Sequence, residues 1–228
     1  MRVSEAQLSV GNEELDGTDH VPLLSDTSGH KRPLTVRGAR TRDSLVAAAR
    51  VVFERDGFLA SRLTDITAEA HCATGSFYTY FANKEEILQA VIQGAESEML
   101  HPGMPRLEPE DQSPEAVIAA SNAAYVAAYK KNAKLMVILE QLAASDPKFR
   151  QLRARRSQAF ANRNTRAIKD LQDRGLADPT LDPYVAAFAL SAMVGRMAYI
   201  VFCLGEDISE ERLVETLTRL WVNALRLK

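Results

Sequence analysis

The sequence contains little of what would place it in several common classes of protein. Its only two cysteines, Cys72 and Cys203, lie far apart and show neither a CxxC pair nor a Cys/His spacing. A disulfide framework and a zinc site are therefore not indicated, which fits a reducing cytoplasm. No apolar run without charge is long enough to cross a membrane, and the first residues lack the apolar stretch of a signal peptide. We therefore expect neither a membrane span nor secretion.

Sequence motifs of common enzymes are also absent. The chain has no GxGxxG, HExxH or GxSxG pattern and no phosphate-binding GxxxxGKS/T loop. The histidines His20, His30, His71 and His101 are isolated, and no carboxylate pairs with a histidine at helical spacing. We therefore predict no catalytic residues, no metal site and no cofactor. The alternative is a helical enzyme whose site is assembled from distant residues.

What the chain does have is a helix-rich composition and an uneven distribution of charge. Apolar residues make up 46% of it, and several of its 9 prolines lie at apparent helix boundaries. Residues 1–29 carry one arginine and six acids (net −5), and residues 30–84 carry nine basic and five acidic residues (net +4). Residues 85–228 carry eighteen basic and nineteen acidic residues (net −1). Because local charge governs attraction to a polyanion, residues 30–84 are the candidate for DNA binding.

Two short helices joined by a tight turn are predicted within residues 64–84, TDITAEAHCATGSFYTYFANK. Ile66 and Ala70 form one face of the first helix, and Phe77 and Phe81 form one face of the second. With both phenylalanines inward, hydroxyl-bearing side chains point outward. This is typical of a helix that reads base edges and phosphates in the major groove. On spacing alone, a helical hairpin of an ordinary all-α domain remains the alternative.

The segments on either side of this pair also follow readable patterns. Residues 1–36 show no periodicity and predict a disordered tail, whose basic end either lies along DNA or is merely solvated. An amphipathic helix is predicted from Arg42, with Gly57 as its end. Ser61 is the predicted N-cap of the next helix, and Asn83 caps another that leads out of the first domain.

Beyond Pro105 the pattern is helical throughout. The predicted helices cover Ser113 to about Lys131, Lys134–Ala144, Asp146 to about Arg174, Asp182 to about Leu204, and a last stretch from Ser209. The third of these carries a basic cluster without interleaved aromatics, which we interpret as a solvated face: Lys148, Arg150, Arg153, Arg155 and Arg156. The fourth is apolar nearly all round, so most of its surface must be covered.

Residues 42–90 resemble the DNA-binding domain of the TetR family of bacterial transcriptional regulators. The resemblance rests on Arg42, Leu45-Val46, Ala48-Ala49, Phe53, Gly57-Phe58, Asp65-Ile66, Ala70, Gly75-Ser76-Phe77-Tyr78, Phe81, Lys84-Glu85 and Leu88. Two positions depart from the family pattern. His71 stands where the family usually has glycine, so a left-handed backbone there is less comfortable. Arg62 stands where the family often has threonine.

The resemblance implies an all-α protein with an N-terminal three-helix helix-turn-helix domain. The expected divisions are a tail over 1–36, a DNA-binding domain over 37–98, and a larger helical effector-binding and dimerisation domain over 99–228. It implies a cytoplasmic homodimer that represses transcription from a palindromic double-stranded DNA operator and is released by a small, lipophilic effector. A regulator without a small-molecule ligand is the alternative.

The residues expected to contact DNA lie on or beside the second short helix. They are Arg42, Ser61, Arg62, Thr64, Thr74, Gly75, Ser76, Tyr78, Thr79, Tyr80 and Lys84. We expect Tyr78 and Tyr80 to pair with phosphate oxygens and Lys84 to hold the DNA backbone. Since the reading helix has no arginine or asparagine, apolar contacts, hydroxyl groups and DNA shape are expected to carry much of the specificity.

The second domain supplies two further predicted sites. The family's dimer interface usually comes from the last two helices, which here points to residues of about 182–204 and 208–227, with Leu213, Leu217, Leu220 and Trp221 as the apolar stripe of the last. The alternative is that this stripe packs only within the subunit. The predicted effector-contacting residues, each of which could equally be core, are Tyr125, Tyr129, Met136, Leu139, Phe160, Met193, Arg196 and Met197. Arg196, a lone charge in an apolar helix, needs a partner. An acid across the dimer, helix-end carbonyls and an anionic effector are all open, with a structural partner preferred.

Overall fold

The computed structural model describes residues 35–102 and 113–228. Within these ranges every regular element is an α-helix, so the all-α prediction is confirmed. The predicted tail lies outside the described residues except for its last two. Of these, Thr35 caps the first helix, because its hydroxyl oxygen accepts a hydrogen bond from the backbone N–H of Gly38 at 3.1 Å.

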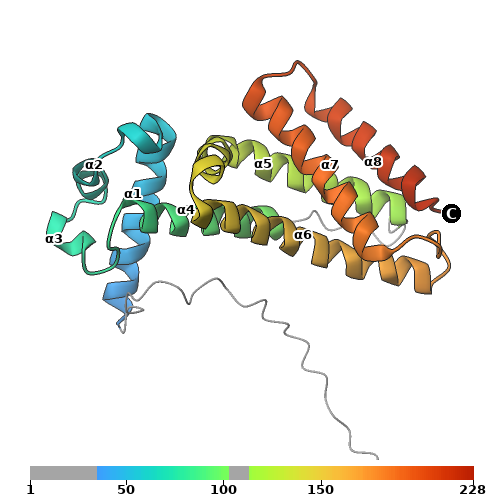
Figure 1. Cartoon of the computed structure of the whole chain (residues 1–228), viewed down its shortest axis with the longest axis horizontal. Coiled ribbons are helices and arrows are strands. Elements are labelled where there is room, and N and C mark those ends of the chain that lie inside the picture. Colours follow the sequence, from blue (N-terminus) through green and yellow to red (C-terminus); the bar gives the residue numbers. More distant parts are fainter. Residues whose placement is uncertain (1–34, 103–112) are drawn as a thin grey trace, which may run out of the picture.

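Three helices pack together at the N-terminal end of the molecule, and a fourth leads away from them (Figure 1). They are α1 (Val36–Ala60), α2 (Leu63–Glu69), α3 (Thr74–Phe77) and α4 (Lys84–Leu100). α1 begins earlier than the predicted Arg42. At Gly57, the predicted helix end, the backbone is non-helical with φ 75° and ψ 170°, so the regular helix is interrupted there and a short helical stretch follows to Ala60.

The remaining helices form a bundle. They are α5 (Pro114–Ser145), α6 (Pro147–Asp173), α7 (Pro183–Leu204) and α8 (Glu210–Leu225). α5 runs unbroken through the gap predicted between Lys131 and Lys134, since no proline or glycine interrupts it. The polar side chain in this stretch is satisfied inside the helix, because Asn132 donates to the Ala128 carbonyl at 2.9 Å.

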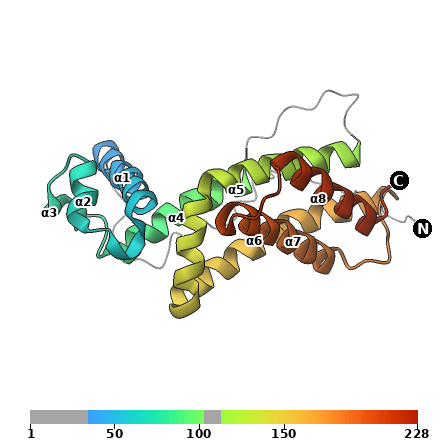
Figure 2. The same ribbon diagram turned by 90° about the horizontal axis from the view of Figure 1, so that it is seen from above.

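Figures 1 and 2 both place α1–α3 at one end of an elongated molecule and the α5–α8 bundle at the other. α4 lies between them and packs against α1 on one side and against α5 and α6 on the other. Within the bundle, α6 packs against α5 and α7, and α8 packs against α5. α4 is therefore the element shared by both parts of the molecule.

α7 leaves much of its apolar surface uncovered. Among the described helices it is long and apolar enough to cross a membrane, which by itself is weak evidence of a span, and only 22% of its most apolar window is buried. Val185, Phe188 and Leu204 are 62%, 40% and 61% exposed. Since α7 packs on α5 and α6 with its other face, the exposed side is an apolar surface without a partner in this chain.

The α8 stripe predicted for the dimer interface is mostly part of the subunit's own core. Leu213, Leu217 and Trp221 are buried within this chain, and only Leu220 is exposed. The neighbouring Thr218 accepts a hydrogen bond from Asn122 of α5 at 3.2 Å, which shows the direction in which this face of α8 points. Three of the four predicted interface residues therefore pack inside the subunit.

Candidate nucleic-acid interface and ligand cavity

The turn between α2 and α3 adopts the left-handed backbone that the sequence raised as a question. His71 has φ 51°, and it is one of two non-glycine residues with positive φ in the described ranges. The turn is closed by two backbone hydrogen bonds, from His71 N–H to the Ala68 carbonyl and from Cys72 N–H to the Thr67 carbonyl, each at 3.0 Å. Histidine adopts this conformation at a cost of roughly 1–2 kcal/mol relative to glycine.

In the reading segment, the α-helix is shorter than the predicted helix over Thr74–Phe81. Only Thr74–Phe77 is α-helical. The chain then continues in turns, with Thr79 N–H bonded to the Ser76 carbonyl at 3.3 Å and Tyr80 N–H to the Phe77 carbonyl at 2.9 Å. The predicted inward face is confirmed, because Phe77 and Phe81 are both buried with ring centroids 5.7 Å apart.

The side chains predicted to read DNA occupy the outer face of this segment. Thr74, Gly75, Tyr78 and Thr79 are exposed, while Ser76 and Tyr80 are half-buried. Arg62 and Thr64, at the start of α2, are exposed as well. The Tyr78 ring stands edge-on to Phe77 with centroids 5.5 Å apart, so packing orients an exposed phenol. This arrangement presents hydroxyl groups and one guanidinium on the surface of the helix-turn-helix.

Ser61 differs from the prediction both as a cap and as a contact residue. Its side chain is buried, and its hydroxyl donates to the Phe58 carbonyl at 2.8 Å. The N-cap of α2 is instead Arg62, whose backbone N–H donates to the Asp65 carboxylate at 3.2 Å. The Ser61 hydroxyl therefore serves the end of α1, and its burial does not support a DNA contact.

Lys84 is also engaged within the protein. Its ammonium donates to the carbonyls of Phe58 at 2.6 Å and Ser61 at 2.9 Å, and it lies 4.5 Å from the centroid of the Phe58 ring. These carbonyls end α1, so the first residue of α4 satisfies acceptors that the end of a helix leaves free. The structure thus gives Lys84 a cap role that the expected grip on the DNA backbone did not include.

Basic residues at the start of α1 extend the positive surface. Arg37 and Arg40 are exposed, and the Arg42 guanidinium lies 5.1 Å from the centroid of the Phe81 ring. The last contact places the N-terminal part of α1 against the reading segment. Arg37 and Arg40 lie inside the predicted DNA-binding domain but are not among the contact residues expected from the sequence.

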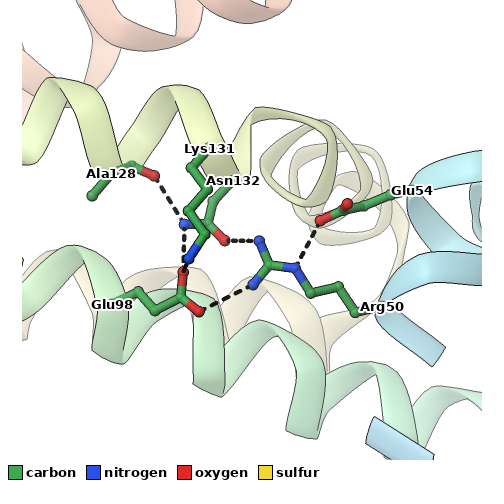
Figure 3. A network of polar contacts seen from close by, with 6 residues as sticks. All are labelled: Arg50, Glu54, Glu98, Ala128, Lys131 and Asn132. Carbon is green, nitrogen blue, oxygen red and sulfur yellow. Dashed lines mark hydrogen bonds and ion pairs between the residues drawn. The ribbon is translucent and has the colours of Figure 1, made fainter. Parts of the chain in front are cut away.

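Three helices meet in a polar network that joins the two parts of the molecule (Figure 3). Arg50 of α1 donates to Glu98 of α4 at 3.2 Å and to the amide oxygen of Asn132 of α5 at 2.8 Å. Asn132 in turn donates to Glu98 at 3.3 Å, and Lys131 pairs with the same carboxylate at 2.9 Å. Arg50 also pairs with Glu54 at 2.9 Å. Asn132 is fully buried, so its amide depends on these partners.

A cavity of about 570 Å³ lies within the bundle, lined mainly by α5, α6 and α7. Of the predicted effector residues, Tyr125, Tyr129, Phe160 and Arg196 line it. The other four do not: Met136 and Leu139 are buried in the core, and Met193 and Met197 pack against it half-buried. Arg196 is exposed and lies 5.1 Å from the Tyr199 ring centroid, so the predicted burial of its charge does not occur in the single chain.

Four arginines of α6 line this cavity, Arg150, Arg153, Arg156 and Arg163, although the sequence indicated a solvated face for the cluster that contains the first three. Arg150 and Arg153 are exposed, whereas Arg156 and Arg163 are half-buried. Arg156 donates to the Tyr125 hydroxyl at 3.0 Å and lies 5.6 Å from the ring centroids of both Tyr129 and Phe160. Arg163 donates to the Leu100 carbonyl at 2.8 Å and lies 5.5 Å from the Phe160 ring. Burial lowers the pKa of Arg163. The prediction failed for Arg156 because periodicity alone does not show how α6 is rotated.

Glu96 of α4 is an acid that interacts electrostatically with Arg156. Burial raises the pKa of its carboxyl to about 7, and attraction to Arg156 only partly opposes that shift. One carboxyl oxygen of Glu96 is buried without a hydrogen-bond partner. The group is therefore close to half-protonated near neutral pH, which places a proton-binding side chain between α4 and the cavity.

A helix-turn-helix with exposed hydroxyl and basic groups, followed by a helical bundle with a ligand-sized cavity, defines the class of helix-turn-helix transcriptional regulators. Two family models agree. "Bacterial regulatory proteins, tetR family" matches residues 45–91, and "Transcriptional regulator EthR, C-terminal domain" matches residues 118–226. Together they cover more than half of the chain. The chain belongs to the TetR family of bacterial transcriptional regulators, and it is a DNA-binding protein of that family.

Individual relatives are distant. The chain is 35% identical over 65 residues to the uncharacterized HTH-type transcriptional regulator YxbF of Bacillus subtilis, a match that covers 28% of this chain and 17% of that protein. A TetR-family regulator from Rhodococcus shares the fold with a TM-score of 0.67 at 20% identity, covering 82% of this chain and 98% of the other.

SmeT, the repressor of the Stenotrophomonas maltophilia multidrug efflux pump SmeDEF, has a TM-score of 0.63 at 21% identity, covering 82% and 90% of the two chains. The SmeT-triclosan complex has a TM-score of 0.64 at 22% identity, covering 81% of this chain and 91% of the other. At these identities the structural matches establish the fold alone.

The contacts of Lys84 predict a loss of stability when its charge is removed. Lys84→Met should lower the free energy of unfolding by about 1–3 kcal/mol, because the carbonyls at the end of α1 lose a charged donor. Urea denaturation measures this change. Lys169→Met, which removes an exposed ammonium paired with Asp173, should change stability by less than about 0.5 kcal/mol. Unchanged stability of Lys84→Met, with a salt slope of operator binding lowered by about one, would instead assign Lys84 to a phosphate.

Because the pKa of Glu96 is raised, Glu96→Gln should increase the stability of the folded protein by an amount that depends on pH. The unfolded carboxyl loses its proton near pH 4.5 and the folded one near pH 7, so the folded protein loses stability between these values. The variant should match the wild type near pH 4 and be about 1–3 kcal/mol more stable at pH 8. Thermal or urea unfolding across this range measures the difference, and the surface variant Asp170→Asn should show none. An equal gain in stability at pH 4 and pH 8 contradicts the raised pKa of Glu96.

Proposed function

We propose that the protein is a homodimeric transcriptional repressor that binds a palindromic operator and is released by a small ligand in the cavity of the bundle. In this proposal it acts on DNA in the cytoplasm and has no catalytic role. DNA is read by the segment Thr74–Phe81 together with Arg62 and Thr64, and the N-terminal turns of α1 lie along phosphates. A regulator without a small-molecule ligand is the second candidate, but it leaves the cavity without a role.

The observation that carries this proposal is the position of α4. Its first residue, Lys84, caps α1 beside the helix-turn-helix. Its last turn contacts both half-buried arginines of the cavity: the Met99 sulfur lies 3.8 Å from Arg156, and the Leu100 carbonyl accepts from Arg163 at 2.8 Å. α4 thus contacts the helices α1–α3, here called the reading unit, at one end and the arginines of the ligand cavity at the other. A ligand that shifts α6 against α4 therefore changes the position of the reading unit.

The dimer is proposed to form through the outer faces of α7 and α8. The exposed apolar residues of α7 and the exposed Leu220 of α8 would be covered by the same surface of a second chain. These are the two helices expected from the sequence, but of the four expected α8 residues only Leu220 is available, because the others are buried inside the subunit. Two reading units joined this way should face half-sites about 34–36 Å apart, one turn of DNA.

Repression and small-molecule release are consistent with what is known of one protein of the same fold. SmeT is a repressor, and one of its structures is a complex with triclosan. The apolar and aromatic lining of the cavity here supports a lipophilic ligand body. The identity of that ligand does not follow from SmeT, since the two chains share only the fold.

The proposed interface predicts that a monomer loses operator binding. Wild type should be a dimer by sedimentation at micromolar concentration and should protect a palindrome in the DNA next to its own gene. Val185→Glu combined with Leu220→Glu should give a folded monomer, because both residues are exposed in the single chain, and should weaken operator binding by more than about 100-fold.

Two controls make this experiment specific. Arg155→Glu places an acid on the exposed face of α6 and should leave the dimer and operator binding unchanged. Leu217→Glu should unfold the chain, since that side chain is buried within the subunit. A wild-type monomer, or a double variant that stays dimeric, contradicts the proposed interface. Failure of the wild type to protect any adjacent DNA contradicts the proposed function.

A further inference from the structure

The half-buried arginines of the cavity have almost none of the partners that buried cations need. Arg156 gives one hydrogen bond to a neutral hydroxyl and one weak contact to sulfur, and its Nε is buried without an acceptor. Arg163 donates to a carbonyl and to the Asn164 amide oxygen. Within the described part of the chain, neither guanidinium pairs with a carboxylate at salt-bridge distance. A guanidinium in this setting is an incompletely satisfied receptor for an anion.

The surroundings of these arginines specify what kind of anion fits. Both guanidinium groups border the Phe160 ring, and Arg156 also faces the Tyr129 ring. The indole N–H of Trp221, another residue that lines the cavity, is buried without an acceptor. The cavity therefore combines an aromatic and apolar lining with several arginines and a neutral donor, and the acid in its lining, Glu140, pairs with Arg153 at 2.7 Å. Glu96, the internal acid that acts on Arg156, is half-neutralised near pH 7 and does not supply a full counter-charge.

We propose that the cavity binds an amphipathic monoanion, a carboxylic acid with an apolar or aromatic body, whose carboxylate is held by Arg156 with Arg163 beside it. This inference rests on the proposed function, because it takes the cavity to be the effector site. It replaces Arg196, the anion partner considered from the sequence, with Arg156, because Arg196 is exposed whereas the Arg156 Nε is buried without an acceptor. A carboxylate offers two acceptor oxygens in the plane that a guanidinium matches, which is why this anion suits a site with an unpaired Nε.

The same contacts give the anion a route to the reading unit. Arg156 and Arg163 make polar contacts to the last residues of α4, Met99 and Leu100. A carboxylate that draws both guanidinium groups into the cavity competes with these contacts and frees the end of α4. An uncharged ligand of the same shape fills the apolar part of the cavity without this competition. The charge, rather than the apolar body, is therefore the signal for release.

Binding of matched ligands tests the proposal directly. The probes are decanoate, decanamide and decylamine, and 2-naphthoate, 2-naphthamide and 2-naphthylmethylamine, each titrated calorimetrically against the full-length wild type at pH 7.5. On at least one body the acid should bind about 10- to 100-fold more tightly than the amide, the ratio expected for a buried charge-assisted hydrogen bond, and the amine should bind most weakly.

Three variants connect that preference to Arg156. Arg156→Met should bind acid and amide equally, and Arg156→Lys should keep part of the preference because it keeps the charge. Arg155→Met removes the neighbouring exposed guanidinium and should behave as the wild type. The inference is overturned if both acids bind the wild type no more tightly than their amides, if neither acid binds at millimolar concentration, or if Arg156→Met retains the preference.

Operator binding of each ligand-free protein, measured in parallel by fluorescence anisotropy, separates this inference from the proposed function. Wild type that binds operator but shows no preference for acids leaves the repressor proposal standing and rejects only the anion site. Wild type that binds no operator rejects the proposed function itself, whatever the calorimetry shows.

Discussion

The side-chain amide of Asn132 is the point at which three helices are tied together (Figure 3). Its oxygen accepts from Arg50 of α1, and its nitrogen donates to Glu98 of α4 and to the Ala128 carbonyl of its own helix. Both polar atoms of this fully buried amide are hydrogen-bonded, so moving the three helices apart would leave a buried polar group unsatisfied. An apolar side chain at this position would pack against its neighbours without fixing the relative orientation of α1, α4 and α5. The network thus fixes how the reading unit sits on the bundle, and the sites at either end depend on that geometry.

Within this frame α4 couples two regions with opposite chemical demands. The DNA-reading end must present hydroxyl and basic groups to solvent while its phenylalanines stay buried. The bundle must keep an internal space, and the cost of doing so appears as incompletely satisfied polar groups, Arg156, Trp221 and Glu96, around the cavity. Unsatisfied groups of this kind are destabilising in a protein core and therefore indicate a function. Two of them lie at the end of the helix that carries the reading unit: Glu96 belongs to α4, and Arg156 contacts Met99 in its last turn.

Sequence periodicity predicted the helix class, the helix-turn-helix and its inward phenylalanines, because spacings of three and four residues report directly on a helix face. The left-handed turn at His71 was also readable, from a single departure from the family pattern. The rotation of the charged helix α6 about its own axis could not be predicted from the sequence. Arg155 is exposed while Arg156 lies in the cavity, and only packing against α5 and α7 separates these adjacent residues. The cap role of Lys84 and the burial of Leu213, Leu217 and Trp221 inside the subunit were not readable for the same reason, since local pattern does not say which neighbour a side chain contacts.

In the proposed dimer, the Arg50 network should hold the two reading units at a fixed spacing. Electron–electron double resonance between spin labels on Ser44→Cys, exposed on α1, measures that spacing in a Cys72→Ser, Cys203→Ser background. The account predicts one narrow distance distribution for this protein and for Arg55→Met, which removes an exposed pair with Asp56. Arg50→Met should broaden or shift the distribution. An unchanged, equally narrow distribution in Arg50→Met would contradict the account.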